Sequence, residues 1–412
     1  MAEIRPFCAI RPEPEWAEKI AALPYDVYDR KEARAETEKH PDSFLCIDRA
    51  ETQLPEDTDP YAPEVYQKAH ELLEKWIKEG RFLKDKKKCY YVYEETREGR
   101  VQTGIVACAS VDDYENGVIK KHEETRAEKE QDRIRHVDTC NAQTGPIFLA
   151  YRKNEEIEKI TEMVKRKQPV CDFVSVEGIR QRVFVIDDDR QIAEIKRAFA
   201  SIHAIYIADG HHRAASAVKV SEMRRNEHPG YTGKEEYNYF LSVLFPDEDL
   251  LIMDYNRIVK DLNGMTAQEF LSRMEEHFLV SRCERKERRP KEKGIFGMYL
   301  DGAWYQCRIR AEDKSSDPVE NLDVFILQEK VLSPLLGITE PKTDARISFA
   351  GGIRGLDYLE QKVDGGWAVA FAMHPTSIAE LFAVADAGKL MPPKSTWFEP
   401  KLYSGLFLHE LN

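Results

Sequence analysis

The sequence predicts a mixed α/β protein, and three observations support that prediction. Short apolar segments rich in β-branched and aromatic residues have the length and composition of strands. Other segments repeat apolar residues every three or four positions, which is typical of amphipathic helices. The two kinds of segment alternate from residue 182 to residue 225, and this order usually builds a parallel or mixed sheet covered by helices.

The N-terminal part begins with proline-rich turns and then shows regular elements. The pattern from Pro63 to Lys78 predicts a helix, and Gly80 is placed to end it. Cys89 to Glu94 and Val101 to Ser110 predict two strands, which the turn Arg97–Arg100 joins into a hairpin.

The remaining elements follow the same two patterns. Helices are predicted over residues 120–140, 155–167, 192–199, 213–225, 266–278, 324–331 and 377–387, and strands over 182–187, 204–208, 237–245, 295–300, 304–309 and 369–373. A chain of 412 residues is too long for one ordinary core. The break at Pro246 predicts a core domain of residues 1–245 and a C-terminal α/β region of residues 246–412 that closes over the site.

Composition narrows the classes of function. Apolar residues make up 42% and charged residues 33%, as in globular proteins, and the net charge of −13 disfavours nucleic acid as a partner. No stretch approaches the roughly 20 apolar residues of a membrane span, and the N-terminus lacks the apolar core of a signal peptide. We therefore expect a soluble, cytoplasmic protein without a membrane partner. The eight cysteines form no C-x-x-C pair, so no zinc site is expected.

The segment Asp209-Gly210-His211-His212-Arg213 is the leading candidate site. It follows an apolar strand and opens an Ala-rich helix, so the unpaired N–H groups and the positive end of the helix dipole favour an anion there. Two histidines and an arginine add donors suited to phosphate, and Asp209 is placed to cap the helix or to hold a metal ion. The alternative is that Asp209 is only an N-cap and that the histidines are surface residues.

A second candidate is the charged segment from His122 to Arg133. On a helix, His122, Arg126, Lys129 and Arg133 would share one face. That face would line a nucleotide site, with Glu123 or Asp132 available as a base or a magnesium ligand. The alternative is an exposed helix laced with salt bridges.

Two further segments are weaker candidates. Gly351-Gly352-Ile353-Arg354-Gly355 is not a dinucleotide-binding fingerprint and is typical of a flexible turn. The proline-stiffened segment from Met391 to Lys401 carries Lys394, Ser395, Thr396 and Lys401, which suit an anion. A C-terminal strap across the core is the alternative for that segment.

These motifs also carry a resemblance. The Asp209–Arg213 segment resembles the G-x-x-R signature of the ParB/sulfiredoxin-like superfamily, in which a glycine turn and a helix start bind nucleotide phosphates. The whole chain resembles a bacterial and archaeal family catalogued as domain of unknown function 1015. The matching pieces are Pro24-Tyr25-Asp26-Val27, His122-Glu123-x-Thr125, Asp132-Arg133, Pro146-Ile147-Phe148, Asp209 to Arg213, Gly351-Gly352-Ile353-Arg354, Pro375-Thr376-Ser377 and Pro392-Pro393-Lys394-Ser395-Thr396.

The superfamily resemblance implies a fold and an activity. Free serine kinases in that superfamily carry a similar D-G-H-x-R element on a compact nucleotide-binding α/β core, and they phosphorylate free L-serine with ADP or ATP. The resemblance implies that Asp209, Gly210, His211, His212 and Arg213 handle phosphate or metal here. The catalytic glutamate of those kinases lies N-terminal to the motif, and Glu123 is our candidate for it.

We therefore predict an enzyme of serine metabolism, a phosphotransferase that moves a phosphoryl group of ATP or ADP to a small hydroxylated metabolite such as free serine. His212, Arg213 and the helix N-terminus hold phosphates, Asp209 places Mg²⁺, and Glu123 beside His122 accepts the hydroxyl proton. Arg126, Lys129, Arg133, Lys394, Ser395 and Thr396 complete the nucleotide site. The alternatives are a non-enzymatic ParB-like nucleotide-binding regulator and a nucleotide-dependent hydrolase. The acceptor, the nucleotide base and a homo-oligomeric state stay open.

Overall fold

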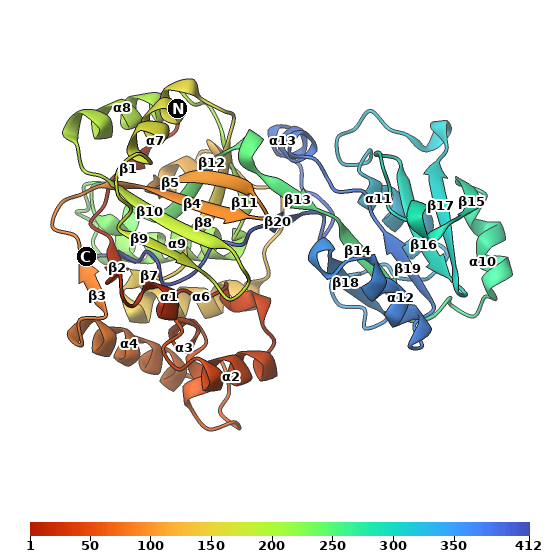
Figure 1. Ribbon diagram of the computed structural model, residues 1–412, viewed down its shortest axis with the longest axis horizontal. Helices are drawn as coiled ribbons and strands as arrows, with labels where there is room; N and C mark the ends of the chain where they lie inside the picture. Colours follow the sequence, from red (N-terminus) through yellow and green to blue (C-terminus); the bar gives the residue numbers. More distant parts are fainter. The chain divides into compact units, whose positions relative to one another are not determined.

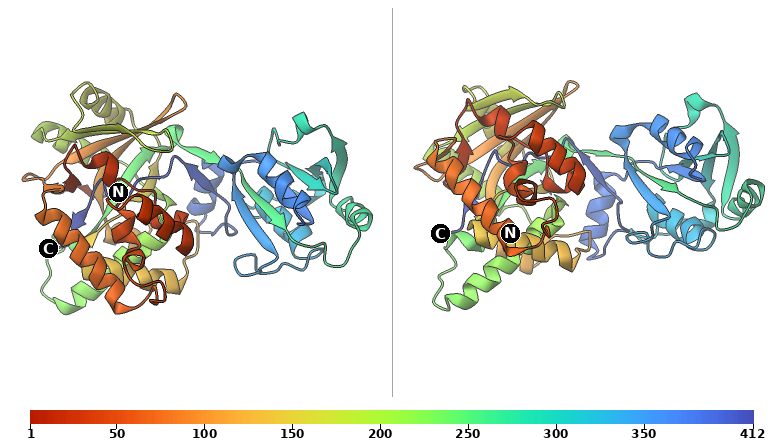
Figure 2. Two further views of the ribbon diagram at one scale, coloured as in Figure 1. Left: turned by 60° about the horizontal axis from the view of Figure 1, so that its bottom comes forward. Right: turned by 90° about the horizontal axis from the view of Figure 1, so that it is seen from below.

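The computed structural model describes residues 1–412, which form two compact units (Figures 1 and 2). The first comprises Met1–Lys120, Thr125–Leu250 and Pro400–Asn412, and the second comprises Lys121–Glu124 and Leu251–Glu399. The predicted division placed the last 13 residues in the C-terminal region. They pack in the first unit because Ser404 and Leu408 exchange backbone hydrogen bonds with Ala22 and Ile10.

A nine-stranded mixed sheet organises the first unit. The strands of this unit are β1 (Ile4–Arg5), β2 (Ile10–Pro12), β3 (Phe82–Lys84), β4 (Tyr90–Arg97), β5 (Arg100–Ser110), β6 (Ile119–Lys120), β7 (Ala142–Gln143), β8 (Ile147–Tyr151), β9 (Cys171–Val174), β10 (Arg180–Ile186), β11 (Ile205–Asp209), β12 (Tyr239–Pro246) and β21 (His409–Glu410). The order is β6-β11-β8-β12-β5-β4-β10-β9, with β1 beside β5. The pairs β11–β6 and β12–β8 are parallel and the others antiparallel, so the predicted mixed sheet is confirmed.

Helices enclose this sheet and build two apolar cores. They are α1 (Ala17–Ile20), α2 (Arg30–Lys39), α3 (Leu45–Asp48), α4 (Pro63–Lys78), α5 (Val111–Glu115), α6 (Ala127–Cys140), α7 (Glu155–Val164), α8 (Asp189–Ala200) and α9 (His211–Glu227). Apolar residues of α7, α8 and α9 pack against the sheet. Helices α1 to α4 form a second core with the end of α6 and Leu408, and they cluster together in Figure 2.

Helix α4 and the β4–β5 hairpin lie where the sequence predicted them, but the helix predicted over residues 120–140 is too long. It begins only at Ala127, so His122 and Arg126 do not share a helical face with Lys129 and Arg133. Residues 121–126 offer no large apolar side chain that would hold a helical turn against a core. Instead, the His122 carbonyl accepts a hydrogen bond from the Met391 N–H at 2.8 Å, within the second unit.

The second unit contains a six-stranded antiparallel sheet of order β15-β17-β16-β19-β14-β18. The helices and strands of the second unit are β13 (Leu251–Met253), β14 (Tyr255–Val259), α10 (Ala267–Met274), β15 (Phe278–Cys283), β16 (Ile295–Leu300), β17 (Ala303–Ile309), α11 (Asp323–Leu327), β18 (Ile347–Gly351), α12 (Leu356–Asp364), β19 (Val369–Ala372), α13 (Ile378–Asp386) and β20 (Trp397–Glu399). The strands predicted over residues 295–300 and 304–309 are present as β16 and β17, which pair antiparallel, and the Thr266 side chain caps α10. Strand β13 pairs with β20, and Leu251 faces Glu399, so the chain enters and leaves this unit through neighbouring strands.

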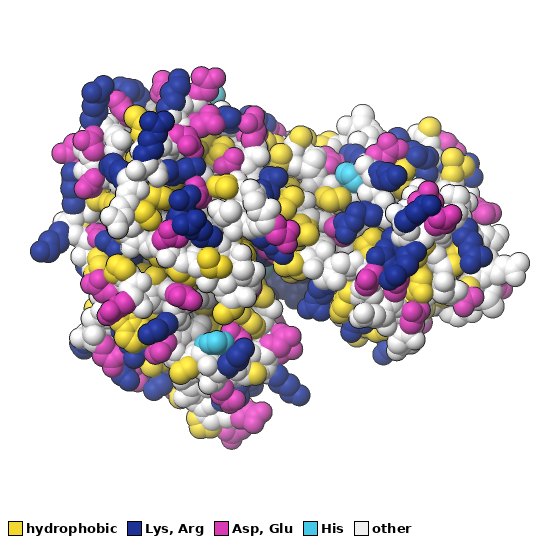
Figure 3. All heavy atoms as spheres, in the orientation of Figure 1, with side chains coloured by type: hydrophobic (Ala, Val, Ile, Leu, Met, Phe, Trp, Pro, Cys, Tyr) yellow, Lys and Arg dark blue, Asp and Glu magenta, His cyan; other side chains and the backbone are white.

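The surface charge, the helix lengths and the cysteines can be compared with what the composition predicts. Acidic and basic side chains are interspersed over the face seen in Figure 3. No helix is long and apolar enough to cross a membrane. All eight cysteines are free thiols.

Candidate active site

The site begins where buried strand β11 meets helix α9. The strand is irregular at this end, because its pairing with β8 shifts register between Ile207 and Asp209. Such a bulge turns the strand end away from the regular ladder. Gly210 then takes a left-handed conformation with φ of +90° and serves as the N-cap of α9. Glycine is the residue that adopts this conformation at least cost, and it has no side chain to cap the first N–H groups of the helix.

Asp209 is held in a charged hydrogen-bond network rather than acting as a cap. Its Oδ1 accepts the Gly210 N–H at 2.8 Å, and its Oδ2 lies 2.7 Å from Lys401 Nζ. The alternative of Asp209 as the N-cap is therefore wrong, since that position belongs to Gly210. Burial acts to raise the pKa of Asp209, but the charges of Lys401 and Arg213 hold that pKa well below its usual range. The carboxylate is thus anionic at neutral pH.

Arg213 reaches back from the first turn of α9 across the glycine turn. Its Nη1 donates to the Pro146 carbonyl at 2.6 Å. A Cβ on Gly210 would lie 3.2 Å from Arg213 Nε, and a Cβ on Gly145 would lie 3.3 Å from Arg213 Nη1. Two glycines therefore make room for this guanidinium, which fixes a cation beside the helix N-terminus.

The two histidines have different surroundings. His211 is 5% exposed and belongs to the interior. His212 is half-buried, and its Nε2 accepts the Arg126 N–H at 3.0 Å. Burial and the nearby Lys129 lower the pKa of His212, so its ring is neutral at pH 7 and carries its hydrogen on Nδ1. His212 therefore has one N–H left with which to bind an oxygen.

Helix α6 brings more of the predicted residues to α9. The two helices pack together, and Ser216 Oγ donates to the Glu130 carbonyl at 3.1 Å. Arg126 and Lys129 are exposed at the start of α6. Arg133 is buried, and its Nε lies 2.9 Å from Asp132 Oδ2. The structure thus gathers the Asp209–Arg213 segment and the cationic residues of α6 in one unit.

A polar cavity lies next to Arg213. A small space of about 30 Å³ is lined by Arg213, and a larger one of about 270 Å³ lies beside it. The residues that line both are Tyr25, Asp48, Arg133 and His136. The Tyr25 ring stacks under the Arg133 guanidinium at 4.1 Å, and Thr144 Oγ1 donates to Asp48 Oδ1 at 2.9 Å.

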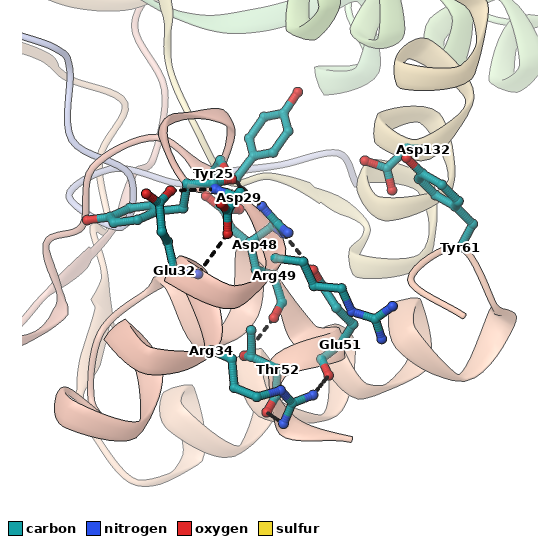
Figure 4. A network of polar contacts seen from close by, with 12 residues as sticks. Tyr25, Asp29, Glu32, Arg34, Asp48, Arg49, Glu51, Thr52, Tyr61 and Asp132 are labelled. Carbon is teal, nitrogen blue, oxygen red and sulfur yellow. Dashed lines mark hydrogen bonds and ion pairs between the residues drawn. The ribbon is translucent and has the colours of Figure 1, made fainter. Parts of the chain in front are cut away.

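Helices α2 and α3 stiffen one wall of the larger cavity (Figure 4). Arg49 pairs with Glu51 at 2.6 Å and donates to the carbonyls of Tyr25 and Tyr28. Arg34 donates to three carbonyls, those of Glu51, Thr52 and Leu54. Sequence reasoning missed Asp48, Arg49, Glu51 and His136, because no local motif marks residues that converge only in three dimensions. The proline turn before Tyr25 was the available signal.

Five predicted site residues belong to the second unit, and their part in the site stays a prediction. They are His122, Glu123, Lys394, Ser395 and Thr396. Ser395 is buried there, and its hydroxyl donates to the Pro392 carbonyl at 2.6 Å. Lys394 Nζ lies over the Tyr255 ring at 5.6 Å. Lys401, from the same proline-stiffened segment, lies instead in the first unit beside Asp209.

The residues of the site suit a magnesium ion only together with a bound nucleotide. No group of three or more histidine, cysteine, aspartate or glutamate side chains is arranged as a metal site. Mg²⁺ bound with a nucleotide needs only one or two carboxylates, because phosphate oxygens and waters complete its shell. A single anionic Asp209 fits that requirement.

Fold and site together define a mixed α/β protein with a polar site at a glycine turn before a helix. The chain belongs to the family described as Protein of unknown function (DUF1015), whose model matches residues 4–325, and this confirms the family resemblance. No curated protein matches the chain. The likeness to the ParB/sulfiredoxin-like superfamily stays a prediction.

Solved structures show distant similarity. C-terminally truncated SbnI from Staphylococcus aureus is 14% identical over 72% of this chain and 84% of that chain, with a TM-score of 0.38. A free serine kinase in complex with AMP is 14% identical over 72% and 86%, with a TM-score of 0.36. A conserved hypothetical protein from Pyrococcus furiosus is 15% identical over 74% and 93%, with a TM-score of 0.35.

Proposed function

We propose that this protein is a phosphotransferase that moves the terminal phosphoryl group of ATP or ADP to the hydroxyl of a small metabolite, with free L-serine as the first candidate. The arrangement of Arg213 is the observation that carries the proposal. Its guanidinium sits between two glycines at the start of α9 and beside the Asp209–Lys401 pair. It also lines the space next to a 270 Å³ polar cavity that can hold a small acceptor.

Phosphoryl transfer depends on positioning and charge neutralisation, and the first unit supplies both. The N–H groups at the start of α9, His212 Nδ1–H and Arg213 are suited to phosphate oxygens. Lys401, Arg126 and Lys129 add positive charge. Mg²⁺ neutralises further phosphate charge when bound, and Asp209 is the carboxylate that would hold it.

The proton of the acceptor hydroxyl needs a carboxylate, and two candidates exist. Glu123 of the second unit is the candidate that the motif resemblance supports. Asp132 of the first unit lines the larger cavity, where Tyr66 and Arg133 fix its orientation. Glu123→Gln and Asp132→Asn, assayed in parallel, identify the base as the residue whose change lowers kcat about 10²-fold or more.

A turnover assay tests the proposed activity. ATP and ADP are each supplied with Mg²⁺, with and without L-serine, and both the nucleotide product and phosphoserine are measured. Consumption that requires serine and yields equal amounts of the two products is expected. Nucleotide consumption without serine would indicate a hydrolase, and binding without consumption would indicate a regulator. Either result would overturn the phosphotransferase proposal.

A further inference from the structure

His136 is a buried histidine with an unsatisfied ring nitrogen. It lies on α6, is 3% exposed, and lines both cavities. Its Nε2 is 3.1 Å from the Ile47 carbonyl. A carbonyl oxygen only accepts hydrogen bonds, so Nε2 carries the hydrogen and Nδ1 of the neutral ring is an acceptor. Nδ1 is buried, and no group of the chain donates to it.

The surroundings of His136 keep its ring neutral. Burial and the adjacent Arg133 lower the pKa of His136, against the smaller opposing effect of Asp48. Arg133 cannot satisfy Nδ1 from the chain, because it directs its donors to Asp132 and to the Asp48 carbonyl. Buried polar groups of folded proteins are almost always satisfied, so an unpaired acceptor on a residue that lines two cavities points to a partner from outside the chain.

Acidic and basic side chains line the larger cavity in equal numbers, which suits a zwitterionic ligand. Its wall carries four carboxylates and four cationic side chains, so the formal charges cancel. Tyr25, Tyr28, Tyr61 and Tyr66 line the same space and add aromatic and hydroxyl groups. A small molecule that bears both an ammonium and a carboxylate group matches such a wall better than a polyanion does.

We infer that this cavity binds the phosphoryl acceptor as a small hydroxylated zwitterion, and that His136 Nδ1 accepts a hydrogen bond from its hydroxyl or ammonium group. The inference rests on the proposed function, since it assigns that reaction its acceptor site. Arg213 lines the adjoining space, so the acceptor lies next to the phosphate-binding turn. His136 is thereby a substrate-binding residue, and the carboxylate base remains a separate group.

Two substitutions separate ligand binding from a structural role. Asparagine places its side-chain oxygen where Nδ1 was, whereas glutamine extends one bond further and reaches the position of Nε2. In the full chain, we expect His136→Asn to bind L-serine within about threefold of wild type and His136→Gln to weaken binding at least about tenfold, measured by calorimetry. If His136 only holds Ile47, His136→Gln binds as wild type does and His136→Asn alone loses thermal stability, which overturns the inference.

Analogues identify the donor group, and nuclear magnetic resonance covers the case in which a variant does not fold. Binding of glycerate but not alanine assigns the hydroxyl to Nδ1, and the converse assigns the ammonium; both support the inference. In wild-type protein with ¹⁵N-labelled histidine, the Nδ1 resonance of His136 should move on addition of L-serine. A resonance that serine leaves in place shows that only water meets Nδ1, and this result overturns the inference.

The two proposals fail separately. If serine binding depends on His136 but no phosphoryl transfer occurs, the proposed phosphotransferase activity is wrong and the proposed acceptor site is supported. If transfer depends on serine and His136→Gln leaves the KM for serine unchanged, the proposed activity is supported and the proposed acceptor site is wrong.

Discussion

At the scale of single residues, Arg213 is the side chain on which the proposed chemistry depends most. Arg213→Ala removes a fixed cation from the phosphate-binding turn. We expect turnover to fall about 10²–10³-fold, or roughly 2.7–4 kcal/mol, as for other preorganised donors in active sites. The measurement is kcat/KM with ATP and L-serine, together with a thermal melt that shows a folded protein.

Arg213→Lys is the matched control for charge. It keeps the cation but not the planar fork that reaches the Pro146 carbonyl, so we expect an intermediate loss of turnover. Full activity in Arg213→Ala would make this turn a scaffold and would remove the main support for the proposed function.

Asp209 gives a prediction that depends on pH. Although burial opposes it, the charges of Lys401 and Arg213 hold the Asp209 pKa below the unfolded value of about 3.9. A lowered folded pKa contributes stability that is fully present above the unfolded pKa and is lost as the pH falls through the folded pKa. The difference in Tm between wild type and Asp209→Asn should therefore be constant from about pH 8 to pH 5 and shrink below about pH 4.

Lys401→Met is the control for this pair. If the contact of 2.7 Å is the source of the stability, the double variant loses less than the sum of the single losses. Additive losses, or a Tm difference that stays undiminished down to about pH 2, would contradict the assignment. Asp209→Asn should also weaken the dependence of turnover on Mg²⁺, if Asp209 holds the ion.

At the scale of elements, the turn between β11 and α9 tests how glycine positions the site. Gly210→Ala forces a left-handed residue, at a cost of about 1–2 kcal/mol, and brings its Cβ 3.2 Å from Arg213 Nε. Gly233 has φ of +79° and nothing within 4 Å of its Cβ position. Gly233→Ala therefore introduces the same backbone strain but displaces no neighbouring side chain. Both variants should lose similar stability, but only Gly210→Ala should lose turnover. Equal turnover in both would show that the position of Arg213 does not matter.

The same elements show what the sequence could predict. Helix α4 and the β4–β5 hairpin have strong periodicity and clear end signals, so local sequence determines them. The turn at Gly210 was predictable for the same reason. The start of α6 was not, because residues 121–126 are polar and their conformation depends on a partner distant in sequence, Met391.

The residues that line the cavity could not be predicted from local sequence patterns. Asp48 and His136 are 88 positions apart in the chain, and they line one space because α3 and α6 pack in the same core. Their neighbours in sequence are ordinary helix residues. Only the packed structure reveals that Nδ1 of His136 lacks a donor.

At the scale of the whole molecule, the chain path suggests how to separate the two units. Residues 251–399 leave and return through β13 and β20, whose ends Leu251 and Glu399 are paired. Directly opposed residues of an antiparallel pair have Cα atoms about 4.5–5.5 Å apart, so a short Gly-Ser linker can join Leu250 to Pro400. The first unit keeps both of its apolar cores and the strand β21 in such a protein.

We expect this excised first unit to fold in one cooperative transition and to bind ATP as the full chain does, because Gly210 to Arg213, Arg126 and Lys129 all belong to it. On the proposal that Glu123 is the base, turnover should fall about 10²-fold or more, because the Met391 contact that holds the segment of Glu123 is lost. Thermal melts, nucleotide titration and the serine-dependent assay measure the three properties on one sample. Full turnover would assign the base to the first unit, with Asp132 as its carboxylate. A folded unit that no longer binds ATP would place essential phosphate contacts in residues 251–399.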